Sequence, residues 1–429
     1  MKQVHVSSGK RVFLINQFFY PDLAATSQLL SDLAEFLASR GWHVTAIAGR
    51  GSYVKGEKAK SAGAFWKAVF VRRVWCTNFG KGNLAGRLSD YLTFLLSGAI
   101  TVALAPKADV VICLSTPPFV ALLGLIARMK GSRFIYKVED LYPEIAVALC
   151  TLKQQSLLTG FLSRLSSLVL RKADCVVALD DAMSERLQNV GAALVDTIPN
   201  WADGAAIRPD PEAGQSFRKA NDLEGKFVVL YSGNAGLAHR FDAVMEAAER
   251  CVAEIPEVLF LFVGNGARSN EIRESAVRLK NVRFMDYQPR ETLNELYNAA
   301  DIHLVTLRDE VSGLLFPSKY PAALAAGKPV LLVGGQSAPF AREIQVNKLG
   351  WSCPHASWMV IRALQAAINN PGMVGAMGRT ARHVFTDRYS KTIAMQRWEH
   401  VLESVLKDKM QIANLSVFRK KKAVSFRSL

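Results

Sequence analysis

The fold of this chain is signalled by one stretch, Ser312-Gly-Leu-Leu-Phe-Pro-Ser-Lys-Tyr-Pro-Ala-Ala-Leu-Ala-Ala-Gly-Lys-Pro-Val330. A loop rich in glycine and proline, 312–317, leads into a helix of small residues that we expect to end at Gly327, and a buried strand follows at once. Ser318 and Lys319 fall in the first turn of that helix, where free N–H groups, the positive dipole end and an ammonium come together. Such a turn can bind an anion, but Ser318 can equally be a simple N-cap. The stretch alone leaves both interpretations open.

Length and charge indicate several domains and anionic partners. The chain has 429 residues, enough for two or three domains. Its 53 Lys and Arg residues against 37 Asp and Glu give a net charge of +16, which favours nucleotide phosphates, nucleic acid or an acidic membrane face. Basic patches interleaved with aromatic residues are not apparent, so we expect no nucleic-acid partner. The histidines have no metal-ligand spacing, and the six cysteines lie far apart, which predicts no metal site and no disulfide framework.

Targeting signals are not visible in the sequence. The N-terminus is polar, and the most apolar region, 91–129, is interrupted by prolines and charges, so we predict neither a signal peptide nor a membrane-spanning helix. These features favour a cytoplasmic protein. Residues 407–429 form a basic tail that contains Phe418-Arg-Lys-Lys-Lys422. The tail has two interpretations, a solvated chain end or a contact with acidic lipid.

Alternating strand and helix patterns divide the chain into two halves of the same type. Each half contains six short apolar runs typical of buried parallel strands, with helices between them; the runs cover 12–15, 43–47, 70–75, 110–114, 133–138, 174–179, 227–231, 258–263, 282–285, 302–305, 330–333 and 350–353. Residues 197–203 mark the boundary, and a connector rich in Pro, Gly and charge follows to about 225. We therefore predict an α/β protein of two Rossmann-like lobes with a cleft between them. The lobes are 1–203, joined by a C-terminal helix at 385–406, and 204–384.

Glycine-rich turns in the second lobe predict a phosphate site. Leu230–Gly236 and Phe262–Gly266 each leave a strand through small residues, and the 312–319 loop supplies a third strand end. A glycine lets a phosphate approach the backbone closely, although each turn alone could be an ordinary tight turn. Three such ends on one sheet edge favour a phosphorylated ligand. The G-x-G-x-x-G fingerprint is absent from the first βα turn, which argues against an NAD-dependent dehydrogenase.

Carboxylates follow the strand at 133–138 in the first lobe. Glu139, Asp140 and Glu144 could bind sugar hydroxyls or do acid/base work; alternatively they stabilise a helix N-terminus that has Pro143 in its first turn. Thr26 and Ser27 precede the first helix, where capping is the favoured interpretation over ligand contact. His239 and His303 are expected to be structural.

In this order the motifs resemble those of the family 4 glycosyltransferases, which have the two-lobed GT-B fold. The resemblance extends from Val12 to about Leu406. Its carriers are Phe19-Tyr-Pro21, Gly41-Trp-His-Val44, Ile198-Pro-Asn-Trp-Ala-Asp203, Tyr231-Ser-Gly-Asn234, Phe262-Val-Gly-Asn-Gly266, Asn281-Val-Arg-Phe284, Pro317-Ser-Lys319 and Ala326-Gly-Lys-Pro-Val330. Val138-Glu-Asp-Leu-Tyr-Pro-Glu144 and Phe316-Pro-Ser-Lys319 are similar to the branch that builds bacterial O-antigens, colanic acid and other exopolysaccharides.

The resemblance implies a retaining transfer from a nucleotide-diphosphate sugar, without a metal or other cofactor. The C-terminal lobe would bind the donor through Gly233, Asn234, Asn265, Gly266, Phe316, Pro317, Ser318 and Lys319. Lys319 would stabilise the leaving diphosphate, and Glu139 or Asp140 would lie near the transferred sugar. Tyr20, Thr26, Ser27 and Glu144 would lie on the acceptor side of the cleft, in the N-terminal lobe.

The chain departs from the family pattern at one point. Many members carry two glutamates eight positions apart, and here Leu314 and Ala322 occupy those places, while Glu310 is out of register. Either other residues contact the donor hydroxyls and ribose, or these roles are lost. The basic residue that often follows the first glycine-rich turn has two candidates here, His239 and Arg240.

The sequence thus predicts a glycosyltransferase of cell-surface polysaccharide synthesis. It would act at the inner face of the plasma membrane, as a peripheral protein on an acidic lipid surface, with a polyprenyl-linked glycan precursor as acceptor. Two alternatives are a nucleotide-sugar 2-epimerase of the same fold and a non-catalytic nucleotide-sugar-binding partner.

Overall fold

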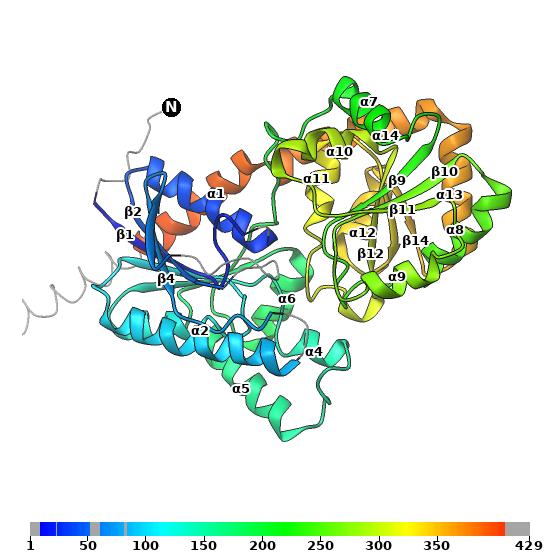
Figure 1. Cartoon of the computed structure of the whole chain (residues 1–429). Helices are drawn as coiled ribbons and strands as arrows, with labels where there is room; N and C mark the ends of the chain where they lie inside the picture. The colour runs from blue at the N-terminus through cyan, green and yellow to red at the C-terminus, as the bar shows by residue number, and fades with distance from the viewer. Residues whose placement is uncertain (1–8, 23, 52–60, 81–83, 408–429) are drawn as a thin grey trace, which may run out of the picture.

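The computed structural model describes residues 9–22, 24–51, 61–80 and 84–407 (Figure 1). The basic tail at 408–429 lies outside the described residues. Two lobes, each a twisted sheet flanked by helices, lie side by side (Figure 1). The α/β class and the two-lobed arrangement predicted from the sequence are therefore confirmed.

The first lobe is built on an eight-stranded sheet in the order β3-β4-β2-β1-β5-β6-β7-β8. All neighbours are parallel except β3 and β4, which form an antiparallel hairpin. The strands are β1 (Arg11–Ile15), β2 (His43–Gly49), β3 (Gly63–Trp66), β4 (Val69–Val74), β5 (Val110–Cys113), β6 (Arg133–Lys137), β7 (Cys175–Ala178) and β8 (Val195–Thr197). β3 and β8 were not predicted, because both are short and carry no sustained apolar run.

Helices cover both faces of this first sheet. The helices are α1 (Ala25–Ser39), α2 (Leu84–Leu104), α3 (Leu122–Met129), α4 (Glu144–Ala148), α5 (Leu157–Lys172) and α6 (Asp181–Val190). α2, α3 and α5 pack on one face. The other face is covered by α1 and by the helical residues 391–407, whose Trp398 is completely buried. The last described helix of the chain therefore belongs to the core of the first lobe.

The second lobe has a fully parallel six-stranded sheet in the order β11-β10-β9-β12-β13-β14. Its strands are β9 (Phe227–Ser232), β10 (Val258–Val263), β11 (Val282–Met285), β12 (Ile302–Leu307), β13 (Val330–Gly334) and β14 (Gly350–Cys353). Its helices are α7 (Pro211–Ala220), α8 (Asp242–Glu254), α9 (Ser269–Ser275), α10 (Leu293–Ala299), α11 (Lys319–Ala325), α12 (Pro339–Val346), α13 (Ser357–Asn369) and α14 (Pro371–Val384). A π turn at Phe385–Tyr389 leads back to the first lobe.

The connector predicted at 204–225 is not irregular, because it contains helix α7. The side chain of Asp210 caps that helix by accepting a hydrogen bond from the Ala213 N–H, and Pro211 occupies its first turn. An N-cap Asp followed by Pro is a helix-start signal that the Pro- and charge-rich composition obscured.

Both sheets reverse their strand order where ligands bind in open α/β folds. The reversals lie between β1 and β5 in the first lobe and between β9 and β12 in the second. Ligand sites in such sheets form outside the carboxyl ends of the strands at these points. Direct contact between the lobes occurs close by, since the Leu141 N–H donates to the Leu314 carbonyl at 3.0 Å. In the described part of the chain, no helix combines the length and apolar character needed to cross a membrane.

Candidate functional site

Two glycine turns pack against each other at the carboxyl edge of the second sheet. Gly233 follows β9 with φ of +125°, and Gly264 follows the neighbouring β10 with φ of +115°. A Cβ on Gly264 would lie 2.5 Å from the Gly233 carbonyl oxygen, and one on Gly266 would lie 2.4 Å from that of Ala235. Gly264 thus excludes a side chain both by conformation and by space, Gly266 excludes one by space, and Gly233 disfavours one by conformation. The turns predicted from the sequence therefore form one continuous backbone surface.

A buried lysine lies next to this surface. Lys319, the first residue of α11, is 9% exposed, and its Cε is 3.5 Å from the position that a Cβ on Gly233 would take. Its ammonium donates to the Tyr231 hydroxyl at 3.1 Å and lies 3.4 Å from Nε2 of His239. The Nζ atom is also 4.4 Å from the centre of the Tyr231 ring. Tyr231 and His239, one before and one after the first glycine turn, thus flank the ammonium of Lys319.

The partners of this lysine are themselves fixed by backbone carbonyls. The Tyr231 hydroxyl donates to the Asn234 carbonyl at 2.9 Å, and Nδ1 of His239 is 2.6 Å from the Thr306 carbonyl. A proton on Nδ1 leaves Nε2 as an acceptor that faces Lys319. The hydroxyl oxygen of Tyr231 is likewise an acceptor toward the lysine. Both neighbours therefore accept from Lys319, and neither supplies a negative charge.

Burial without a counter-ion shifts the pKa values of Lys319 and His239. It lowers the pKa of Lys319 to about 7. Burial, followed by the charge of Lys319, lowers the pKa of His239 well below its usual value. Desolvation disfavours the charged form, and an anion beside Lys319 would restore it. The site therefore favours a negative charge, and the described residues around Lys319 do not supply one.

The side chains flanking Lys319 separate into exposed and buried groups. Ser318 is exposed and occupies the N-cap position of α11, as the alternative interpretation predicted, but its side chain makes no capping hydrogen bond to the helix. Phe316, predicted to contact the donor, is instead a core residue, because its ring packs on Tyr320, Phe340 and Tyr389. Pro317 is also buried and lies in the turn before the helix. From this stretch only Ser318 and Lys319 offer polar groups at the site.

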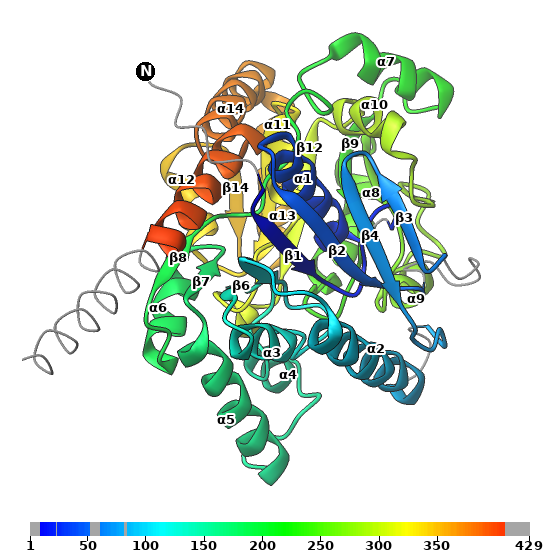
Figure 2. The ribbon, with the colours of Figure 1, turned by 90° about the vertical axis from the view of Figure 1, so that its left-hand side faces the viewer.

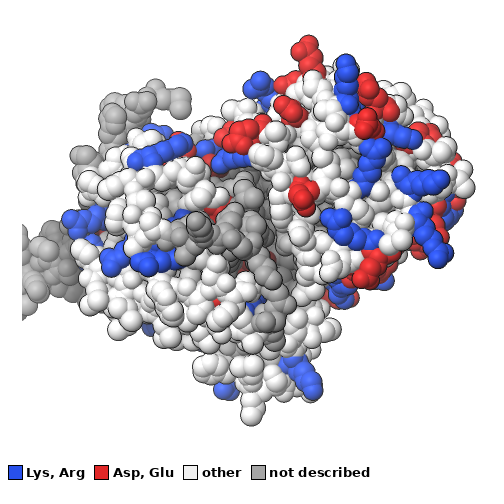
Figure 3. Space-filling model, in the orientation of Figure 1, with Lys and Arg blue, Asp and Glu red and all other residues white. Residues whose placement is uncertain are grey.

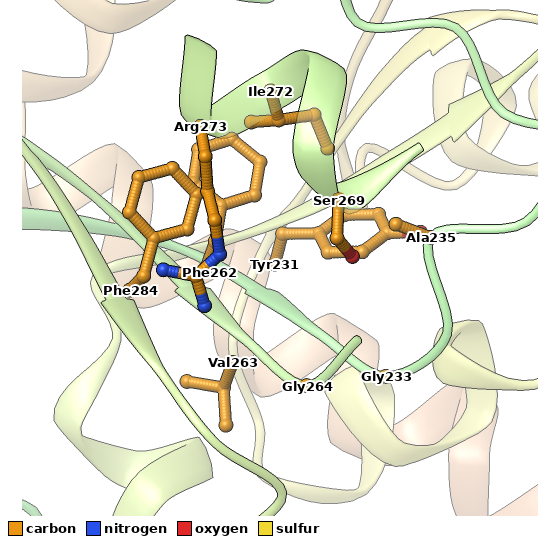
Figure 4. Close-up of a pocket in the computed structure, with 10 residues that line it drawn as sticks. All are labelled: Tyr231, Gly233, Ala235, Phe262, Val263, Gly264, Ser269, Ile272, Arg273 and Phe284. Carbon is orange, nitrogen blue, oxygen red and sulfur yellow. The ribbon is translucent and has the colours of Figure 1, made fainter. Parts of the chain in front are cut away.

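The two glycine turns border a small pocket on the side of β10 and α9. Ten residues line it: Tyr231, Gly233, Ala235, Phe262, Val263, Gly264, Ser269, Ile272, Arg273 and Phe284 (Figure 4). The Arg273 guanidinium carbon lies 4.5 Å from the centre of the Phe284 ring, which stacks on Phe262. Asn234 and Asn265, one in each turn, are exposed beside this aromatic floor. The predicted donor residues of the turns thus share one edge of the sheet.

Glu139 lies in the first lobe but does not face an open site. Its carboxylate forms an ion pair with Lys137 and accepts from Nδ2 of Asn200 at 2.8 Å, and only 6% of the residue is exposed. Lys137 also donates to Asn200 at 2.7 Å and lies over the Trp201 ring. Both partners of the carboxylate belong to β6 and to the 197–203 boundary segment, which favours a structural role for Glu139 over the predicted catalytic one.

Asp140, the next residue, is the carboxylate that reaches the border between the lobes. It forms an isolated bridge with Leu315, four residues before Lys319. No hydrogen bond or ion pair to its carboxylate is found among the described residues, and the Ser115 hydroxyl accepts from its backbone N–H. Burial, followed by the charge of Glu139, raises the pKa of Asp140 to about 7. Asp140 and Lys319 therefore lie on neighbouring segments from opposite lobes.

The acceptor-side residues take different positions. Glu144 begins α4, and its pKa is raised mainly by burial, although one carboxylate oxygen has no hydrogen-bond partner. Tyr20 is exposed and stacks on Trp66 at 4.7 Å. Neither Thr26 nor Ser27 caps α1, which begins at Ala25, so the capping interpretation is wrong. Ser27 is fully buried, with an unpartnered hydroxyl.

Sequence reasoning missed one member of the lysine cluster, Tyr231, which looked like the last apolar residue of a strand. It left His239 with two interpretations, a structural histidine and a candidate for the basic residue after the glycine-rich turn. His239 follows the first glycine turn by three residues, the place of the expected basic residue, and this offset was the available signal. His303 does have the structural role predicted for it, since it is buried and its Nε2 lies 3.0 Å from the Tyr297 carbonyl.

Comparison with known proteins agrees with this geometry. A "Glycosyl transferase 4-like domain" model matches residues 26–201, and a "Glycosyl transferases group 1" model matches residues 214–384. The chain is 27% identical to the probable glycosyltransferase WbjE of Pseudomonas aeruginosa over 78% of its own length and 85% of that protein. It is 25% identical to the putative colanic acid biosynthesis glycosyl transferase WcaI of Escherichia coli, over 72% and 79%. Among solved structures it is similar in fold to Anabaena Alr3699/HepE in complex with UDP-glucose. That TM-score is 0.68 at 16% identity, over 92% of this chain and all of the other.

Proposed function

Because this chain belongs to the family 4 glycosyltransferases of the GT-B fold and is a glycosyltransferase of polysaccharide biosynthesis, we propose that it uses a nucleotide-diphosphate sugar as donor. The buried Lys319 carries this proposal. A cation that has lost its hydration, lacks a counter-ion and lies beside two glycine turns matches a diphosphate in charge and in backbone access. The UDP-glucose bound to Alr3699/HepE, which has the same fold, supports the choice of ligand class.

The diphosphate lies along the turns at Gly233 and Gly264, with Lys319 and Ser318 on one side. During transfer the bond between the sugar C1 and the β-phosphate oxygen breaks, and the electron pair stays on the diphosphate. Lys319 is positioned to stabilise that developing charge. Its neutral partners Tyr231 and His239 hold the ammonium in place without competing for it.

Asp140 acts on the other side of the reaction centre. It follows β6 and contacts the loop that leads to Lys319, so the donor sugar would lie between them. We assign it to hydrogen bonding with the sugar or with the attacking acceptor hydroxyl. A pKa of about 7 keeps a substantial ionised fraction at neutral pH, as a hydrogen-bond acceptor requires. The acceptor is a polyprenyl-linked glycan, transfer retains the anomeric configuration, and no metal is needed.

Donor binding is the direct test of this proposal. The melting temperature of the protein is measured with UDP-, GDP- and dTDP-sugars, because a ligand at about 100 times its Kd stabilises the folded state by about 2.7 kcal/mol. We expect one nucleotide series to raise the melting temperature of the wild type and to leave that of Lys319→Met unchanged. An equal rise in both proteins would contradict the diphosphate assignment, and the absence of any rise would contradict the donor class.

The reaction is tested separately with the donor so identified. Incubation with a lipid-linked glycan should release free nucleoside diphosphate and extend the glycan by one sugar, and NMR of the new linkage gives its anomeric configuration. An epimerised nucleotide sugar formed without acceptor would favour a 2-epimerase instead. Activity after chelation of divalent ions tests the absence of a metal requirement.

A further inference from the structure

The outer side of α2 carries a ridge of exposed apolar side chains. Five large residues recur at every fourth position along its 21 residues and are 47% to 79% exposed: Leu88, Leu92, Leu96, Ile100 and Leu104. Residues four apart lie one above another on a helix, so these side chains form a single row. The row extends along a helix of about 30 Å. The opposite side of α2 packs on the sheet through residues such as Phe94.

Neighbouring helices extend this apolar surface. On α5, Leu157 is 96% exposed, and Leu158, Phe161 and Leu168 are also exposed; Met129 lies at the end of α3 between the two helices. Figures 1 and 2 both show α2 and α5 on the lower side of the first lobe, where α5 projects furthest. We call these ten residues the α2/α5 surface. Isolated exposed apolar residues are normal, but a row supported by two further helices indicates an interaction surface.

The three helices that form this surface expose charge of one sign. Helices α2, α3 and α5 contain a single carboxylate, Asp90, which is buried and accepts hydrogen bonds from Thr77 and Gly80. Four cationic side chains are exposed on or just before α5, namely Lys153, Arg164, Arg171 and Lys172. In Figure 3 the lower part of the first lobe shows almost no red, whereas red and blue are mixed over the second lobe.

A cationic pocket touches the edge of the ridge. It has a volume of about 360 Å³ and is lined by Arg50 and Arg72 together with Ser97, Ile100 and Thr101 of α2. The Nε of Arg50 is buried and has no hydrogen-bond partner. Ile100 belongs to both the ridge and the pocket, so an amphiphile that covers the ridge could place its anionic group here.

The start of the ridge is close to the proposed reaction centre. Tyr91 lies between Leu88 and Leu92, and its pKa is raised by burial and, less strongly, by the charge of Asp140. The start of α2 is therefore within electrostatic range of Asp140. A glycan that projects from a surface in contact with the ridge would have a short path to Asp140.

We propose that the α2/α5 surface docks on a lipid bilayer that contains anionic phospholipids. The ridge lies in the plane of the headgroups, as an amphipathic helix does, and the Arg50/Arg72 pocket takes a lipid phosphate. A second copy of the chain is the less suitable occupant, because a two-fold contact would bring like-charged surfaces together. This assignment rests on the proposed lipid-linked acceptor, whose glycan such docking would present to the cleft.

Vesicle co-sedimentation of the full chain tests the docking surface. We expect the affinity of the wild type for phosphatidylcholine vesicles that contain 30% phosphatidylglycerol to be roughly tenfold or more above its affinity for pure phosphatidylcholine vesicles. The reason is that anionic lipid attracts each nearby cation. Leu92→Glu/Leu96→Glu should reduce binding to the anionic vesicles by at least about tenfold. Val277→Glu/Val346→Glu places the same change on exposed apolar residues of the second lobe and should bind like the wild type. Arg72→Ala should weaken binding to anionic vesicles only.

Several outcomes would overturn the assignment. One is a wild type that does not sediment with the vesicles. Another is a ridge variant that binds them normally and melts like the wild type. A third is a dimer that the wild type forms in solution and that the ridge substitutions dissociate. Loss of binding in Lys420→Ser/Lys421→Ser/Lys422→Ser, with the ridge variant unaffected, would assign docking to the tail instead. Vesicle binding needs no sugar donor, so its result stands apart from the proposed reaction. If the docking surface and the proposed reaction are both correct, the ridge variant still transfers sugar to a water-soluble acceptor.

Discussion

The two lobes share an α/β architecture but differ in how many large apolar side chains they expose and in their net charge. Among the described residues, sixteen of the exposed large hydrophobic side chains lie in the first lobe and five in the second. Residues 204–384 carry 20 Lys and Arg against 18 Asp and Glu, whereas residues 1–203 carry 23 against 15. The second lobe instead concentrates its unusual chemistry inside, at a buried cation. A shared fold thus encloses a buried cation without a counter-ion in one lobe and carries an exposed apolar surface on the other.

Removing the buried cation should have the largest effect. We expect Lys319→Met to lower transfer by about a hundredfold to a thousandfold, since a preorganised electrostatic group of this kind contributes about 10²–10³. Stability should stay equal or rise, because an apolar residue of similar size replaces a desolvated charge. Transfer assays with thermal melts check both results. Lys280→Ala, on the exposed surface of the same lobe, is the control and should change neither quantity.

The two adjacent carboxylates of the first lobe should separate function from stability. Asp140→Asn should lower transfer by about a hundredfold, in line with loss of a positioned acid/base or hydrogen-bonding group, with little change in melting temperature. Glu139→Gln should do the reverse and destabilise the protein by about 3 kcal/mol, because it leaves Lys137 buried without its counter-ion. If Glu139→Gln instead lowers transfer in a fully stable protein, the structural role assigned to Glu139 is wrong.

The packed glycine turns should tolerate no side chain. Gly264→Ala is expected to cost about 2–3 kcal/mol and to weaken donor binding, because the new Cβ would clash with the Gly233 carbonyl. Gly225 offers a matched control, since its φ is also positive but nothing lies within 4 Å of its Cβ position. Gly225→Ala should cost only about 1 kcal/mol of strain. Equal melting temperatures for the two variants would contradict the close packing of the turns.

The proton on Lys319 should give a smaller, pH-dependent signal. Its pKa is about 7 in the folded chain and 10.5 when unfolded, so the unfolded state binds more protons between these values. The stability of the ligand-free wild type should therefore rise relative to Lys319→Met, by up to about 1.4 kcal/mol per pH unit between pH 7 and 9. Donor binding restores the charged form, so binding should take up a proton and weaken with pH over the same range. Calorimetry in buffers of different ionisation enthalpy measures that uptake, and zero uptake at pH 8 would contradict the placement of Lys319 beside the diphosphate.

Sequence patterns predicted every strand except β3 and β8 and the glycine turns of the candidate site, because glycines, apolar runs and helix ends act locally. They did not separate Glu139 from Asp140. Neighbouring residues at a strand end point to opposite sides, and only the distant Asn200 and Lys137 together show which one is enclosed. The sequence also did not show that Phe316 is a core residue, for the same reason. The rings that pack on it, Phe340 and Tyr389, are far away in sequence. The glutamates missing at 314 and 322 are replaced by buried apolar residues, Leu314 and Ala322, so donor contacts there must come from other segments.

The return of the chain to the first lobe has a consequence for its synthesis. Residues 1–203 leave the ribosome first, yet one face of their sheet is covered by α1 and by residues 391–407, with Trp398 in the core. The part of that face under residues 391–407 stays open to water until nearly the whole chain has been made. The second lobe, continuous from α7 to α14, has all its strands earlier. We infer that the lobe translated second completes its core first. Until then, part of the sheet of the first lobe stays exposed to chaperones and to the membrane surface.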